Sequence, residues 1–220
     1  MATGFITGGF RPTNSNTENW IGQVYLYREN EDIPIDDNGK AMLPLLQICL
    51  EGLPYIPDAL KGSKVLTIFV SENMPGRLAY NGDAWVIREY KEEDVLVVKD
   101  IYMQSSSRIK PYPLKSQLIT EDYPVWDSGD IPMDIEDELV EMEDSGEITD
   151  YYDYTDCFAG HKIGGYPNYI QSGIDFGDGY EFMIQIASDE KANLNIIDSG
   201  NFYLAKNSQT GDWRLYCDFY

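Results

Sequence analysis

The residues that could support catalysis meet at one place in the chain, around its single histidine, His161. A Ser-His-Asp or Cys-His site would have to use this residue, and Cys157 stands four positions before it. In a stretch rich in Gly and Tyr, that spacing fixes no geometry. The sequence also lacks a Gly-x-Ser-x-Gly elbow, a phosphate-binding loop and a dinucleotide fingerprint. We therefore expect no enzymatic activity and a structural role for His161, and keep an enzyme with a site near His161 as an alternative.

Metal sites have little support in the sequence. The three cysteines, Cys49, Cys157 and Cys217, form no Cys-x-x-Cys pair, and one histidine is a poor supply of ligands for zinc. Carboxylates do surround two turns, at 36–39 and at 175–181, but neither matches the twelve-residue calcium loop. We expect solvated turns, no metal and no cofactor, and keep a calcium-responsive or housekeeping binding module as an alternative.

Charge is the strongest compositional signal. The chain has 38 Asp and Glu against 16 Lys and Arg, which gives a formal net charge of −22. Such a surface is repelled by nucleic acids and by anionic membranes, and it attracts basic proteins. The composition therefore argues against nucleic-acid and membrane partners and favours a basic protein.

The acidity is concentrated in residues 121–156, which contain 15 Asp and Glu and no Lys or Arg. Like charges at this density destabilise a fold, whereas interleaved aromatic residues can serve as interface anchors. We predict a docking face or a mobile arm for a basic partner; a solvated acidic helix packed on the core and a metal site stay open as alternatives. The predicted partner-binding residues are Asp127, Asp130, Asp134, Glu136, Asp137, Glu138, Glu141, Glu143, Asp144, Tyr151, Tyr152 and Tyr154.

One helix is predicted inside this segment, over residues 131–144. Ile131, Ile135, Leu139 and Met142 form an apolar stripe at helical spacing, and Gly146 can end the helix. Strands are expected elsewhere, at 23–27, 42–50, 65–70, 84–90, 95–98, 181–186, 201–204 and 214–219. Residues 1–20 are predicted to form a loop or a loose arm.

A weak internal repeat accompanies these strands. Gln47 and Gln185 each stand at the centre of an apolar strand, and an aromatic-aliphatic strand follows each about twenty residues later. The repeat predicts one β-rich domain over residues 1–220 with two similar halves and a few short helices. A buried strand glutamine needs hydrogen-bond partners, so both side chains are expected to bind loops.

The segment from His161 to Gln171 resembles the YwqG-like family, a bacterial family of unknown function, and the resemblance continues through residues 182–186, 198–204 and parts of the N-terminal half. The resemblance implies an α+β fold with internal duplication and no established activity, and some family members are taken to be immunity proteins against toxins. The residues of the structural family motif are His161, Lys162, Gly164, Gly165, Pro167, Gln171 and Gln185.

The sequence as a whole supports one expectation about location and function. No signal peptide and no long apolar run is visible, and the odd number of cysteines is typical of a reducing compartment, so we expect a cytoplasmic protein with free thiols. Charge, resemblance and the scarcity of catalytic residues together predict an immunity-type protein that covers the active site of a basic toxin.

Overall fold

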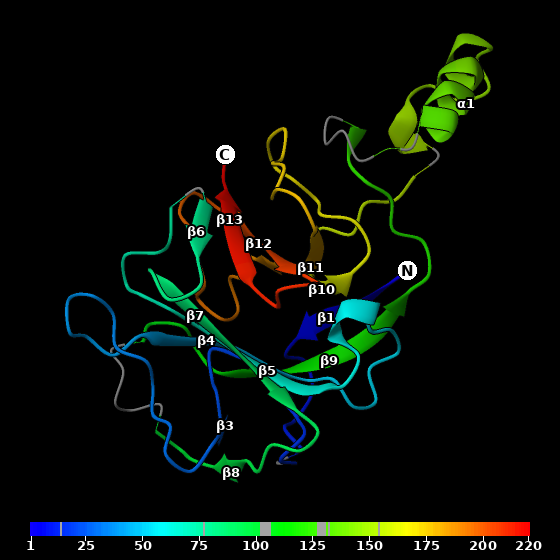
Figure 1. Ribbon diagram of the computed structural model, residues 1–220. Coiled ribbons are helices and arrows are strands. Elements are labelled where there is room, and N and C mark those ends of the chain that lie inside the picture. Colours follow the sequence, from blue (N-terminus) through cyan, green and yellow to red (C-terminus); the bar gives the residue numbers. More distant parts are fainter. Residues whose placement is uncertain (14, 77, 102–106, 127–130, 132, 154) are drawn as a thin grey trace.

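The structure is a computed structural model that describes every residue except 14, 77, 102–106, 127–130, 132 and 154, and only the backbone of Asp134. The chain is rich in β-structure, with about 36% of its residues in strands and 9% in helices. Most strands join one antiparallel sheet of 11 strands, in the order β6-β13-β12-β11-β10-β1-β9-β2-β4-β5-β7. Figure 1 shows these strands wrapped around a common interior.

The elements of the described residues have the following bounds. The large sheet consists of β1 (Ala2–Thr7), β2 (Asn19–Ile21), β4 (Leu43–Cys49), β5 (Ser63–Val70), β6 (Leu78–Tyr80), β7 (Trp85–Lys91), β9 (Tyr112–Ile119), β10 (His161–Gly164), β11 (Tyr180–Ala187), β12 (Asn201–Asn207) and β13 (Trp213–Asp218). A separate two-stranded sheet consists of β3 (Leu26–Tyr27) and β8 (Val97–Val98). The helices are α1 (Met133–Asp144) and the short 3-10 helices η1 (Asp58–Leu60) and η4 (Tyr151–Asp153).

The two edges of the large sheet, β6 and β7, follow each other in the chain and lie close enough to make the sheet nearly closed and barrel-like. The side chain of Asn81, in the connecting turn, spans part of this gap. Its Oδ1 accepts a hydrogen bond from the backbone N–H of Ile87, at 3.0 Å, and its Nδ2 donates to the Ile87 carbonyl, at 3.4 Å. The turn thus satisfies backbone groups that an open sheet edge would expose to other chains.

The interior of the barrel-like sheet is the main hydrophobic core. Inward side chains alternate along the strands, as in β12, where Phe202 and Leu204 are fully buried, and β7, where Trp85 and Ile87 are buried. Every strand of the large sheet contributes at least one side chain to this cluster. Burial of apolar area on this scale, at roughly 25 cal/mol per Å², is the main source of stability for such a domain.

The predicted α+β fold with internal duplication is wrong, because the observed architecture is a single β-rich sheet with little helix. The halves of the chain are not separate units: β1, from the N-terminal half, lies between β9 and β10, and β6 pairs with β13. Two short strands with a central glutamine were too weak a signal to specify how strands from the two halves pair.

The prediction that residues 1–20 form a loop is also wrong for residues 2–7. This segment is β1, a central strand that pairs with β10 on one side and β9 on the other. Its first residues, Ala2, Thr3 and Gly4, are small, so the segment carries no run of large apolar side chains. Long-range pairing on both sides outweighs this weak local preference for a strand.

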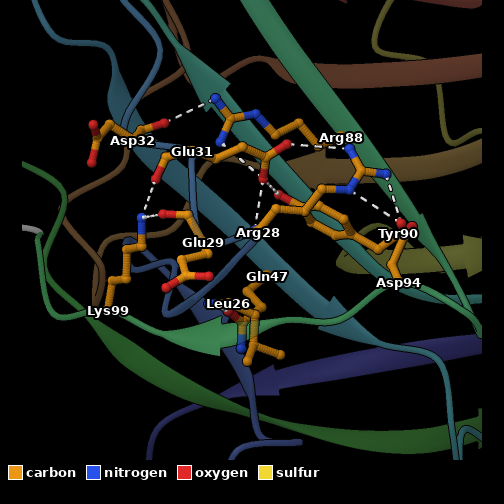
Figure 2. Close-up of polar contacts among 10 residues, drawn as sticks. All are labelled: Leu26, Arg28, Glu29, Glu31, Asp32, Gln47, Arg88, Tyr90, Asp94 and Lys99. Atoms are coloured by element: carbon orange, nitrogen blue, oxygen red, sulfur yellow. Dashed lines mark hydrogen bonds and ion pairs between the residues drawn. The ribbon is translucent and has the colours of Figure 1, made fainter.

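A polar network holds the loop after β3 against β7 (Figure 2). Arg28 donates two hydrogen bonds to Oδ1 of Asp94, at 2.9 and 3.1 Å, and the Tyr90 hydroxyl donates to Glu31, at 2.6 Å. Arg88 of β7 donates to a backbone carbonyl of the same loop. The network explains how a small sheet of only two short strands keeps its place beside the large one.

The helix predicted over residues 131–144 is confirmed, with a start two residues later. Helix α1 spans 133–144. Gly146 follows its last turn with a φ of 76°, and the N–H of Glu147 donates to the carbonyl of Met142 at 2.9 Å. Figure 1 shows α1 standing away from the sheet, and of its apolar stripe only Leu139 is fully buried. In the described part of the chain, no helix has the length and apolarity needed to span a membrane.

A partly buried carboxylate, Glu89 of β7, connects several strands of the barrel-like sheet. Its Oε1 accepts hydrogen bonds from Lys206, Lys91 and Ser63, and its Oε2 accepts from the indole N–H of Trp213 at 3.2 Å. Burial alone would raise the pKa of Glu89, but the bonds from Lys206, Lys91 and Ser63 outweigh burial and lower it to about 2. The carboxylate therefore links β7 to β5, β12 and β13 in its ionised form.

We predict that Glu89 makes stability sensitive to acid in a specific range. Its pKa is lower in the folded chain than the ordinary 4.5, so its contribution is complete above pH 4.5 and is lost as the pH falls toward 2. The loss amounts to about 3 kcal/mol. Denaturant unfolding of the wild type and of Glu89→Gln should therefore show a difference in free energy that shrinks by this amount between pH 4.5 and 2.

The matched control is Glu93→Gln, which changes an exposed carboxylate close to β7. Its difference from the wild type should stay small over the same pH range. A Glu89→Gln difference that does not depend on pH would contradict the assignment.

Candidate functional site

The most prominent surface feature is the acidic arm, which we define as residues 123–156. It leaves the barrel-like sheet after β9 and returns before β10, and Figure 1 shows it projecting beyond the strands. Its two ends meet at a neck, where the backbone N–H of Tyr123 donates to the carbonyl of Asp156 at 3.0 Å. The arm is therefore an excursion between two neighbouring parts of the sheet.

Aromatic contacts give the arm an ordered base. The Tyr151 hydroxyl donates to the carbonyl of Pro124 at 2.7 Å, and the rings of Trp126 and Tyr151 lie 5.1 Å apart. Tyr152 packs edge-on against Tyr151, and its hydroxyl accepts from the N–H of Trp126. Val125 packs against the aromatic cluster outside β12 and β13, so the base of the arm is joined to the sheet.

The outer part of the arm presents carboxylates to solvent. The exposed acidic residues of α1 with described side chains are Glu136, Asp137, Glu138, Glu141, Glu143 and Asp144. Among the described residues, none of these carboxylates takes part in an ion pair. The last turn of α1 holds no basic residue, so its acids face the negative end of the helix dipole, which is unfavourable.

The predicted partner-binding residues fall into three groups. The exposed acids of α1 and the exposed Tyr152 lie together on the arm, as a docking surface requires. Tyr151 is buried and serves the structure of the arm instead. Asp127, Asp130 and Tyr154 lie outside the described residues, and Asp134 is placed only by its backbone on α1.

The arm is attached to the sheet through a buried ion pair just before its neck. Asp122, 5% exposed, accepts from Nζ of Lys162 at 2.9 Å to each carboxylate oxygen, and Lys162 is fully buried on β10. The same carboxylate accepts from the backbone N–H groups of Phe158 and Tyr166, both at 3.0 Å. Burial lowers the pKa of Lys162, although Asp122 opposes that shift, so the pair is costly to bury and depends on its full set of bonds.

Two glycines at the end of β10, Gly164 and Gly165, allow close packing beside this pair. Gly165 has a φ of 70°, and a Cβ added there would lie 2.0 Å from Oδ2 of Asp122. Gly164 has a φ of 74°, and a Cβ there would lie 2.4 Å from the ring of Tyr55. Both positions therefore require glycine for conformation and for space.

His161 has both ring nitrogens engaged. Nδ1 accepts a hydrogen bond from the backbone N–H of Ala187 at 3.1 Å, so the proton of the neutral ring lies on Nε2, which is 3.2 Å from Oδ2 of Asp189. Burial would raise the pKa of Asp189, but the bonds from His161 and from the backbone N–H of Ala192 help to lower it well below its usual range. The ring thus joins β10 to the end of β11 and offers no lone pair to a nucleophile or a metal.

Cys157 does not contact His161. Its thiol donates to the carbonyl of Pro124 at 3.3 Å, and burial, together with the charge of Asp122, raises its pKa. A thiol with a raised pKa is a weak nucleophile at neutral pH. The structure therefore does not form the Cys-His pair that the sequence spacing suggested as an alternative.

The remaining motif residues organise loops. Gln185 accepts from the N–H of Asn168 at 2.7 Å and donates to the carbonyls of Ala159 and Gly160. Gln171 donates to the carbonyl of Phe219 at 2.7 Å.

Pro167 is buried in the loop between β10 and β11. Gln47 accepts from the N–H groups of Tyr25 and Leu26 and donates to the carbonyl of Glu18, so the prediction that both strand glutamines bind loops is confirmed.

No cluster of three His, Cys, Asp or Glu side chains that could hold a metal ion occurs among the described residues. The carboxylates at the two turns serve the turns themselves. Asp36 accepts from the N–H groups of Asn38 and Lys40, and Asp175 accepts from that of Gly177. These bonds are those of Asx turns.

Sequence reasoning missed Asp122 and Asp189 as partners of the motif. Both are single acids in a chain that is rich in acids, and nothing in their local sequence separates them from exposed ones. A usable signal lay in Lys162 instead, because a lysine inside a strand with buried neighbours requires a carboxylate partner.

The comparisons with known proteins are informative about family and not about activity. A family model described as "Domain of unknown function (DUF1963)" matches residues 21–209. No curated protein matches the chain at a significant level. The matched range contains the acidic arm, Asp122 and the motif from His161 to Gln185.

We predict that Lys162→Met destabilises the protein strongly, because it leaves the carboxylate of Asp122 buried without its cation. The expected loss in the free energy of unfolding is about 3–5 kcal/mol, measured by urea denaturation. Lys115→Met, an exposed lysine of β9, is the matched control and should change stability by less than about 0.5 kcal/mol. Equal effects of the two variants would contradict the role given to the pair.

Proposed function

Because the chain belongs to the family described as a domain of unknown function, DUF1963, its own surface is the best guide to its role, and we propose that it is a protein-binding module of the immunity type. In this proposal the acidic arm docks on a basic partner. The observation that carries the proposal is the arm itself, which projects from the sheet with exposed carboxylates and no described ion pair.

Stability does not account for the composition of the arm. A helix selected for stability would place cations in its last turn and mix charges at spacings of three and four, whereas α1 does neither. The helix also leaves apolar side chains in solvent: Met133 is 78% exposed and Val140 41%. Nearby on the arm, Tyr152 of η4 is 55% exposed. Carboxylates around apolar and aromatic groups are the composition expected of a docking surface for a basic protein.

The geometry favours inhibition by coverage. The arm stands out from the sheet on a base held together by Tyr151 and Trp126, so it can enter a concave site without rearrangement of the core. A basic active-site cleft, such as that of a toxin acting on nucleic acids or nucleotides, would accept carboxylates in place of phosphates. The resemblance to the YwqG-like family, in which some members are taken to be immunity proteins, supports a toxin as the partner.

The proposal predicts that binding depends on where the charges lie and not on their number. The arm variant replaces three exposed acids of α1, as Glu138→Gln, Glu141→Gln and Asp144→Asn. The control variant replaces three exposed acids elsewhere, as Glu93→Gln, Glu190→Gln and Asp198→Asn. Both lose three negative charges.

The partner is first captured from cells of the source organism at low salt and then purified for titration. We expect a basic partner in a one-to-one complex, at least tenfold weaker binding by the arm variant, and wild-type binding by the control variant. The partner's toxicity or enzymatic activity should be suppressed by the wild type and by the control variant at equal concentrations. Equal affinity of both variants would show that the arm is not the docking surface, and a complex that leaves the partner active would remove the immunity role.

A further inference from the structure

A small pocket lies far from the acidic arm, where β2 and β4 meet the segment that leads into β3. It has a volume of about 170 Å³ and is lined in part by Trp20, Tyr25, Glu18 and Val98. Because a water molecule occupies about 30 Å³ of liquid, the pocket has room for roughly five or six waters, or for one small organic group. No described residue of the arm lines it.

Two aromatic rings form one side of the pocket. Trp20 is 8% exposed on β2, and its ring centroid lies 5.3 Å from that of Tyr25 at an interplanar angle of 73°. Rings set nearly at right angles form a corner in which a cation can lie against π-electron density. Aromatic side chains arranged in this way bind alkylated ammonium groups in known proteins. The alkyl groups give such a cation an apolar surface and spread its charge.

A carboxylate supplies the opposite charge. Glu18 is 9% exposed, and one of its oxygens accepts from the backbone N–H of Thr13 at 2.7 Å, which fixes the side chain at the pocket. Burial and the charges of Asp100 and Glu18 raise the pKa of Tyr25, as expected where the local potential is negative. A cation in this corner would lie between a ring face and a negative charge.

The described residues that line the pocket supply no cation to it. None of the described lining residues is Lys or Arg. The nearby Lys99 is directed to the loop after β3, where its Nζ donates to the carbonyls of Glu29 and Glu31 (Figure 2).

The floor of the pocket is preorganised. Gln47 uses its oxygen to accept from the N–H groups of Tyr25 and Leu26, at 2.8 and 3.0 Å, and its nitrogen to donate to the carbonyl of Glu18. These bonds fix the backbone on which Tyr25 and Glu18 are carried. A site whose walls are already in place loses little entropy when a ligand enters.

From this corner of Trp20, Tyr25 and Glu18 we infer a binding site for a small methylated ammonium cation, either a free quaternary ammonium compound or the trimethylated ammonium end of a lysine side chain. The rings favour a ligand with an apolar surface, and the carboxylate favours one with a positive charge. The volume of the pocket limits the bound group to a few carbons. This site is independent of the docking role proposed for the arm.

The test is a titration of the whole protein with choline and with Nα-acetyl-Nε-trimethyl-lysine amide, followed by NMR and by tryptophan fluorescence. We expect saturable binding of at least one probe, and the tighter one identifies whether the site serves free cations or protein side chains. The neutral isostere of choline, 3,3-dimethylbutan-1-ol, should bind at least about tenfold more weakly, because it lacks the charge.

Two variants assign the signal to the pocket. Glu18→Gln removes the charge and keeps an oxygen that can accept from Thr13, and it should weaken binding at least about tenfold while the protein stays folded. Tyr25→Leu should weaken binding as well, because it removes one ring. Glu147→Gln, a distant exposed acid, should leave binding unchanged. Failure of both probes to bind, equal binding of the neutral alcohol, or an unchanged affinity of Glu18→Gln would overturn the inference.

Discussion

The structure depends on how one buried charge pair is satisfied. Asp122 and Lys162 lie where the acidic arm joins the sheet, and Lys162 supplies a cation at that junction that the arm itself lacks. The pair also receives two backbone N–H groups and requires Gly165 beside it. Since a buried carboxylate without partners is costly by several kcal/mol, the junction has one arrangement that satisfies every group. The motif from His161 to Gly165 is therefore understood as a structural junction.

The barrel-like sheet solves a second problem of buried polar groups. Its interior is apolar along most of its length, and Glu89 ends the apolar region with a carboxylate bound by two lysines, a serine and an indole. His161 and the two strand glutamines do similar work outside the core, where each joins a strand to a loop. In all these cases a polar side chain of a strand forms hydrogen bonds with backbone or charged groups that the pairing of strands does not engage. The core is thus defined as much by its polar boundaries as by its apolar contents.

Much of this could be predicted from the sequence where the signal is local. Helix α1 and the apolar strands β4, β5, β11 and β12 follow from periodicity and end signals, and Gln47 and Gln185 follow from the need to satisfy buried amides. The α+β fold with duplicated halves was not correct, and β1 was missed, because both depend on pairing between strands distant in the sequence. The partners of Lys162 and His161 were missed for the same reason. A pairwise contact across 40 residues, such as Asp122 with Lys162, leaves no periodic trace in either segment.

The neck of the acidic arm has a consequence for the history of such proteins. Its two ends lie one hydrogen bond apart, between strands that both flank β1. The entropy of closing a loop grows only slowly with its length, by about 0.6 kcal/mol for each doubling. Selection can therefore lengthen, shorten or rewrite the arm while the junction and the sheet stay as they are. The arm and the sheet can evolve separately in this architecture, because the neck divides the proposed docking surface from the residues that form the core.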